Sequence, residues 1–103
     1  MPRFYSERFL LEIHQLDGER LGVKLGKACV NANLPATYVA SVMGVSRMTI
    51  HSWFRGKPLR DKNATLAKQF MNLIEEGVGA GDLPAMKLSH AKEFIEKSIV
   101  RLR

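Results

Sequence analysis

The stretch Leu34–Lys57, which reads LPATYVASVMGVSRMTIHSWFRGK, decides the fold of this chain. Its apolar residues recur at helical spacing in two groups, first Val39, Ala40 and Met43 and then Ile50, Trp53 and Phe54. Gly44 lies between the groups and is suited to end the first helix, because glycine enters the left-handed conformation without steric cost. Ser46 follows as an N-cap. The stretch therefore predicts two short helices joined by a tight turn.

The pattern A-x-x-x-G-V-S-x-x-T-I-x-x-W-x-x-G resembles the helix-turn-helix of Cro-like and lambda-type repressors. The resemblance is carried by Ala40, Gly44, Val45, Ser46, Thr49, Ile50, Trp53 and Gly56. It implies an all-α, lambda-repressor-like core of about four helices over residues 19–77, with additional N- and C-terminal helices. In that family the second helix of the motif enters the major groove of DNA.

The outward side of this second helix is polar and basic. Together with the resemblance, its chemistry assigns base reading to Arg47, Met48, His51 and Ser52. Contacts with the DNA backbone are expected from Thr37, Tyr38, Ser46, Thr49, Arg55, Lys57, Arg60 and Lys62. Partial burial suits Tyr38 equally well, and each basic residue also suits ordinary solvation. Between Arg47 and Lys62 the sequence has one acid, Asp61.

Length and charge bound the kind of protein. The 103 residues suffice for one compact domain, and 16 Lys and Arg against 10 Asp and Glu give a net charge of +6. This charge favours a polyanionic partner without separating nucleic acid from an anionic membrane. No apolar run approaches the ~18 residues needed to span a bilayer. The segment MPRFYSERF also lacks a signal-peptide core. We therefore expect a cytoplasmic protein with no membrane partner.

Residues typical of catalysis or metal binding are sparse. Cys29 is the only cysteine and is expected to be buried. The three histidines lie far apart, without Cys or acidic partners at metal-ligand spacing. The sequence has no phosphate-binding loop, nucleophile elbow or suitably paired acids. We therefore expect no enzyme activity, no cofactor and no metal.

The segments before the motif predict two more helices. Residues 1–18 contain a helical stripe capped by Ser6, although Asp17-Gly18 also allows a β-hairpin. The helix is preferred, because the apolar residues are spaced at three and four rather than alternating. Residues 19–33 are predicted to form a helix, which the resemblance makes the first core helix. In it Gly22 and Gly26 each cost up to ~1 kcal/mol relative to alanine.

Two helices are predicted after the motif. The first covers residues 61–76, with Asp61 or Asn63 as its cap and Gly77 at its end. A linker over residues 78–88 connects it to an amphipathic helix over residues 89–103, capped by Ser89. This last helix must dock on the core or on a second subunit.

These expectations lead to a sequence-specific transcription regulator that binds double-stranded DNA as a homodimer. Its small, free-standing build resembles phage-encoded regulators, including those of cyanophages, for which host RNA polymerase is a further expected partner. The dimer surface is assigned to the N- and C-terminal helices through Phe9, Leu10, Ile13, Phe94, Ile95 and Ile99. The alternatives are the DNA-recognition small subunit of a phage packaging machine and a helix-turn-helix that binds proteins.

Overall fold

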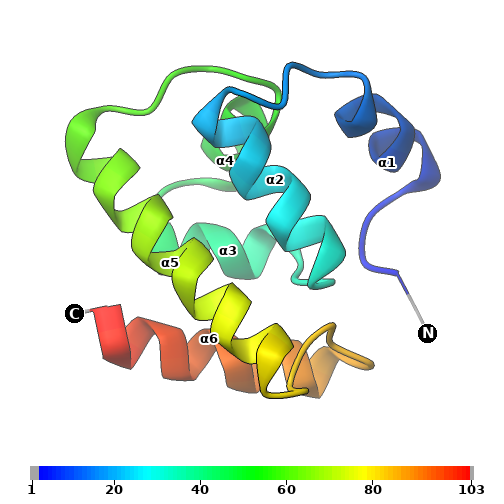
Figure 1. Cartoon of the computed structure of the whole chain (residues 1–103), viewed down its shortest axis with the longest axis vertical. Coiled ribbons are helices and arrows are strands. Elements are labelled where there is room, and N and C mark those ends of the chain that lie inside the picture. The colour runs from blue at the N-terminus through cyan, green and yellow to red at the C-terminus, as the bar shows by residue number, and fades with distance from the viewer. Residues whose placement is uncertain (1–2, 103) are drawn as a thin grey trace.

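Every element of regular secondary structure over residues 3–102, the part that the computed structural model describes, is a helix (Figure 1). The helices are α1 (Glu7–His14), α2 (Leu21–Asn31), α3 (Ala36–Met43), α4 (Arg47–Phe54), α5 (Asp61–Gly79) and α6 (Leu88–Leu102). The predicted all-α class is confirmed. All of them pack around one core, in which the side chain of Cys29 is buried as expected.

Helices α3 and α4 meet at a turn over Gly44–Ser46, as the sequence predicted. Gly44 is in the left-handed conformation, with φ of 69°, and ends α3. The Ser46 hydroxyl caps α4 by accepting a hydrogen bond from the Thr49 amide. The residues of this unit that face the core include Val39, Met43, Ile50, Trp53 and Phe54.

Helix α2 lies in front of α4 in Figure 1 and packs directly on it. Gly22 and Gly26, which weaken α2 as an isolated helix, are the residues at this crossing. Gly22 faces the backbone of Trp53, and Gly26 faces the side chains of Ile13 and Phe54. A side chain at either position would hold the two helices apart, so the glycines allow the close approach.

Helix α1 confirms the helical prediction for the N-terminal segment over the β-hairpin. Ser6 caps it by accepting a hydrogen bond from the Phe9 amide. Phe9 and Ile13 are buried in the core, and the Tyr5 hydroxyl donates to the Leu34 carbonyl oxygen. The N-terminal segment is thereby fixed to the body of the protein.

The predicted dimer surface is wrong for three of its residues. Phe9, Ile13 and Ile95 are buried within this same chain, because α1 and α6 both dock on the core. Leu10, Phe94 and Ile99 are half-buried against that core. The apolar sides of the two helices therefore contact their own chain.

Helix α5 differs from its predicted limits at both ends. Its N-cap is Arg60, without a side-chain hydrogen bond, whereas Asp61 lies in the first turn and Asn63 lies further inside the helix. At the other end α5 continues through Gly77 to Gly79. Gly77 packs against Leu83 and Phe94, so it serves a close approach rather than a cap.

The segment between α5 and α6 is anchored to the core, unlike the linker that was predicted. Leu83 and Ala85 are buried, and the Ala85 amide donates to the Ala32 carbonyl oxygen at 2.9 Å. Helix α6 begins at Leu88, so Ser89 lies inside its first turn. It lies at the bottom of Figure 1 and packs against both α3 and α5. Residues 78–102 are thus part of the same packed unit.

None of the helices within residues 3–102 has the length and apolar character that a membrane crossing requires. Over the same residues, no group of three or more His, Cys, Asp and Glu side chains is placed to hold a metal ion.

Candidate nucleic-acid interface

The start of α4 is fixed by its cap. The Ser46 oxygen lies 3.2 Å from the Thr49 amide and 3.0 Å from the Thr49 hydroxyl. Both side chains that were assigned to the DNA backbone therefore also hold each other. This cap fixes the orientation of the first turn of α4, which contains Arg47.

An outward stripe runs along α4 through Met48, Ser52 and Arg55, which are spaced at i, i+4 and i+7. Met48 is 82% exposed, Ser52 is half-buried, and Arg55 is exposed. Arg47 is exposed beside this stripe. The predicted base-reading residues Arg47, Met48 and Ser52 thus share one accessible edge of the helix.

His51 lies on the side of α4 that α1 covers. Its ring makes edge contacts with Phe9, at 5.7 Å between centroids, and with Phe54, at 6.1 Å. Its Nδ1 atom is buried and has no hydrogen-bond partner within residues 3–102. Burial lowers the pKa of His51, and the nearby positive charges of Arg55 and Arg47 lower it further. The ring is therefore part of the packing between α1 and α4.

Arg55 is held by a residue that the sequence did not point to. Its Nε donates to Glu12 Oε1 at 2.8 Å, and its guanidinium lies over the Phe9 ring, 5.8 Å from the centroid. Glu12 is on α1, 43 positions earlier in the chain. The fold thus brings an acid to α4, although the nearest acid in the local sequence is Asp61. No local signal predicts this pair, because it depends on how α1 docks.

The start of α3 adjoins α4. Its N-cap is Pro35, which makes no side-chain hydrogen bond to the first turn. Thr37 is exposed and Tyr38 is half-buried. Thr37, Arg47 and His51 line one recess of about 320 Å³ together with residues 4–6, Phe9, Pro35 and Ala36. Two predicted contact residues from different helices, Thr37 and Arg47, are therefore brought together.

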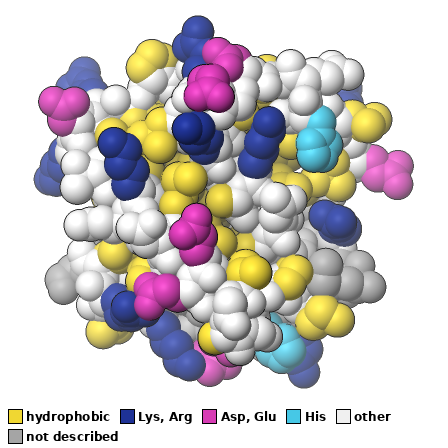
Figure 2. Space-filling model, viewed as in Figure 1, with side chains coloured by type: hydrophobic (Ala, Val, Ile, Leu, Met, Phe, Trp, Pro, Cys, Tyr) yellow, Lys and Arg dark blue, Asp and Glu magenta, His cyan; other side chains and the backbone are white. Residues whose placement is uncertain are grey.

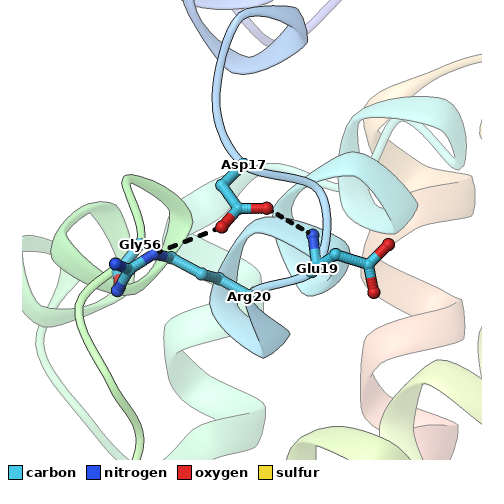
Figure 3. Close-up of polar contacts among 4 residues, drawn as sticks. All are labelled: Asp17, Glu19, Arg20 and Gly56. Carbon is cyan, nitrogen blue, oxygen red and sulfur yellow. Dashed lines mark hydrogen bonds and ion pairs between the residues drawn. The ribbon is translucent and has the colours of Figure 1, made fainter.

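Arg20, the N-cap residue of α2, holds the segment after α4 in place. The Arg20 guanidinium donates from Nη1 to the Gly56 carbonyl oxygen at 3.1 Å, and its Nε lies 3.8 Å from Asp17 Oδ2 (Figure 3). The other Asp17 oxygen accepts from the Glu19 amide at 3.0 Å. Gly56 has a φ of 109°, which favours glycine. The chain therefore leaves α4 in a defined direction.

The basic residues beyond this point are open to solvent. Lys57, Arg60 and Lys62 are exposed. Arg60 directly precedes α5, and Lys62 lies in its first turn. These three cations follow Gly56 without an acidic partner in contact among residues 3–102. They differ in this from Arg55, which was assigned to the same backbone-contacting group.

The face on which α2 and α5 lie in front has a different character. Figure 2 shows Lys and Arg side chains mixed with Asp and Glu side chains on this face. An anion approaching it meets both signs of charge. Helix α4 itself lies behind α2 in this view.

The fold and the candidate site define an all-α protein with a helix pair whose second member has an accessible polar and basic edge. Comparison of the chain with protein-family models, with curated proteins and with solved structures gives no match.

Proposed function

We propose that this protein is a sequence-specific regulator of transcription that binds double-stranded DNA by placing α4 in the major groove. The observation that carries the proposal is that two kinds of side chain lie at one edge of the helix pair: side chains suited to base edges and a side chain suited to the DNA backbone. Arg47, Met48 and Ser52 offer side chains suited to base edges, and Thr37 lies beside Arg47 at the start of α3.

The start of α3 suits a phosphate of the DNA backbone. No side chain caps its first turn. The Tyr38 and Val39 amides donate to the Pro35 carbonyl oxygen, so within the described residues the Ala36 and Thr37 amides are the donors left at the positive end of the helix dipole. Lys57, Arg60 and Lys62 supply further positive charge along the segment after α4. The net charge of +6 attracts the same polyanion at longer range.

Binding as a dimer remains part of the proposal, with a different contact surface. One α4 meets only a few base pairs, whereas two copies related by symmetry present two reading helices ~34 Å apart. Because Phe9, Ile13 and Ile95 are occupied by their own core, the contact would use the outer sides of α1 or α6. Leu11 and Val100 are exposed there, at 67% and 77%. Light scattering after size exclusion, with and without DNA, measures the stoichiometry.

Selection of duplexes from a random pool tests the proposal directly. We expect one enriched motif, and tighter binding to it than to a shuffled duplex of equal length. The logarithm of the affinity should fall linearly with the logarithm of salt concentration, with a slope of about −0.9 for each phosphate contacted. A protein that binds neither duplex at ~50 mM salt is not a DNA-binding regulator.

A protein-binding module is the second candidate, and the exposure of Met48 favours it. A large apolar side chain that is 82% exposed at the start of an outward helical stripe also suits a protein partner. Absence of DNA binding at low salt would support this candidate. Enrichment of a duplex motif that is lost on Met48→Ala would count against it.

A further inference from the structure

We propose that Glu12 is a positioning residue for DNA recognition and that Arg55, which it holds, is a specificity-determining contact to a guanine edge. The inference rests on the proposed function and adds to it a residue from α1, outside the helix pair. It also moves Arg55 from the group that contacts the DNA backbone to the group that reads bases.

Helix α1 is a fixed platform for Glu12. Ile13 is fully buried against α2, and Phe9 is buried against Phe54 of α4. Before the helix, the Tyr5 hydroxyl donates to the Leu34 carbonyl oxygen, and the Tyr5 ring stacks on Phe9. Glu12 is next to Ile13 in the chain, so its backbone position is set by these apolar contacts and does not depend on its carboxylate.

The ion pair itself contributes little to the stability of the fold. The side chains of Arg55 and Glu12 are 49% and 37% exposed, and ion pairs exposed to solvent to this degree contribute little to the free energy of unfolding. The contacts of Phe9 and Ile13 already hold α1 in place. The main effect of the pair is therefore on the conformation of the Arg55 side chain.

Two contacts fix the guanidinium of Arg55 while leaving its outer donors available. The hydrogen bond to Glu12 uses Nε, and the Phe9 ring lies against the guanidinium. The terminal nitrogens remain as a planar pair of donors. Because a long side chain such as Arg loses conformational freedom when it is ordered, an arginine that is already ordered binds at a lower entropic cost.

The place of Arg55 on α4 favours a base edge. As the C-cap residue of α4 it continues the outward stripe of Met48 and Ser52, at i+7 and i+3 from them, and its guanidinium leans toward α1, against Glu12 and Phe9. A planar pair of donors matches the O6 and N7 acceptors of guanine in the major groove. A lysine cannot match this geometry, because its ammonium acts as a single point of charge.

The experiment measures binding of the full chain to its selected duplex and to a shuffled duplex. Glu12→Ala is the test variant, and Glu7→Ala is its control. Both remove one negative charge from α1, but Glu7 is exposed in the first turn and makes no ion pair with α4 in the described part of the chain. Thermal melting of each variant shows whether the fold is retained.

We expect Glu12→Ala to weaken binding to the selected duplex by about tenfold, with little change on the shuffled duplex. Arg55→Lys should lose a similar amount, and the double variant should lose no more than either single one. Glu12→Gln keeps an oxygen within reach of Arg55 Nε and should recover most of the affinity. Glu7→Ala should not weaken the selected complex.

Two results would overturn the inference while leaving the proposed function intact. If Glu12→Ala and Glu7→Ala strengthen binding to both duplexes equally, Glu12 acts only as a negative charge. If Glu12→Ala weakens both duplexes equally with an unchanged melting temperature, Arg55 contacts phosphate and does not read a base. Failure of the unaltered protein to bind any duplex at low salt would instead remove the proposed function, and this inference with it.

Discussion

The backbone carbonyl of Trp53 lies so close to Gly22 that a Cβ built on this glycine would be 2.0 Å from the carbonyl oxygen and 2.7 Å from the carbonyl carbon. Real side chains do not approach backbone atoms this closely. The crossing of α2 over α4 therefore depends on the absence of a side chain at position 22. This contact sets the position of α4 relative to α2. It therefore also sets the position of the proposed reading edge, which α4 carries.

We predict that Gly22→Ala destabilises the protein by about 1–3 kcal/mol or more, because the helices must separate. The expected helix-propensity gain of about 1 kcal/mol is too small to offset this. Gly79→Ala is the matched control, since Gly79 is also helical and a Cβ there meets nothing within 4 Å. Urea denaturation gives both values. Equal stability of the two variants would contradict the close crossing.

The packing of His51 predicts a pH dependence of stability. The pKa of His51 is lowered from 6.5 in the folded protein, first by burial and then by Arg55 and Arg47. As the pH falls, the unfolded chain therefore takes up this proton before the folded one does. The contribution to stability is complete above pH ~6.5 and is lost as the pH falls through the lowered pKa.

Urea denaturation between pH 7.5 and pH 5.5 measures this dependence. His51→Gln should flatten the change in the free energy of unfolding over this range, because its side chain does not titrate. His14→Gln is the control, since His14 is exposed at the end of α1. The same slope in His51→Gln and in the unaltered protein would mean that His51 does not carry the effect.

Arg47 and Lys57 are predicted to differ in how they affect DNA binding. Arg47→Ala should cost ~1–3 kcal/mol on the selected duplex and little on a shuffled one, because Arg47 is assigned to a base. Lys57→Ala should weaken both duplexes by about the same factor and reduce the salt slope by about one contact. Fluorescence anisotropy titrations at two salt concentrations separate the two patterns. An identical loss on both duplexes for Arg47→Ala would remove its base-reading assignment.

Asn33 joins two segments that are distant in the chain. It is fully buried, with φ of 56°, and its side chain accepts from the Phe4 amide at 3.1 Å and donates to the Ala85 carbonyl oxygen at 2.9 Å. Asn33→Ala should therefore cost about 2 kcal/mol or more, because buried backbone groups lose their partners and alanine disfavours this φ.

Hydrogen exchange locates that effect. In Asn33→Ala the Phe4 amide should exchange faster, since its acceptor is removed. Asn33→Gly keeps the left-handed backbone available while also removing the side chain, so the difference between the two variants isolates the strain. Unchanged protection of the Phe4 amide in both variants would show that Asn33 does not hold the N-terminal segment.

The helix pair was predictable because its signals are local. Gly44 and Ser46 act within their own turn, and the apolar spacing that includes Ile50 and Trp53 needs no distant partner. The start of α6 was placed within one residue of Leu88 for the same reason. Most of the exposed edge of α4 was also predictable from the sequence, because the side of a helix opposite its buried apolar residues faces solvent.

The remainder depends on contacts between distant segments. Gly22 and Gly77 appeared to weaken or end helices, but their neighbours Trp53 and Leu83 come from other elements. The pairing of Glu12 with Arg55 follows from the docking of α1, which no spacing within α1 encodes. Local patterns identify what a residue can do, whereas the packed chain decides which of these roles is used.

The buried thiol of Cys29 can report transient opening of the folded structure. Cys29 is the only cysteine, its exposed area is zero, and burial raises the pKa of its thiol. A maleimide or aromatic disulfide reagent can therefore react only when α2 leaves its neighbours. The labelling rate, followed by mass spectrometry, therefore measures how often this part of the structure opens, without any engineered probe. Bound DNA stabilises the folded state and should slow the reaction.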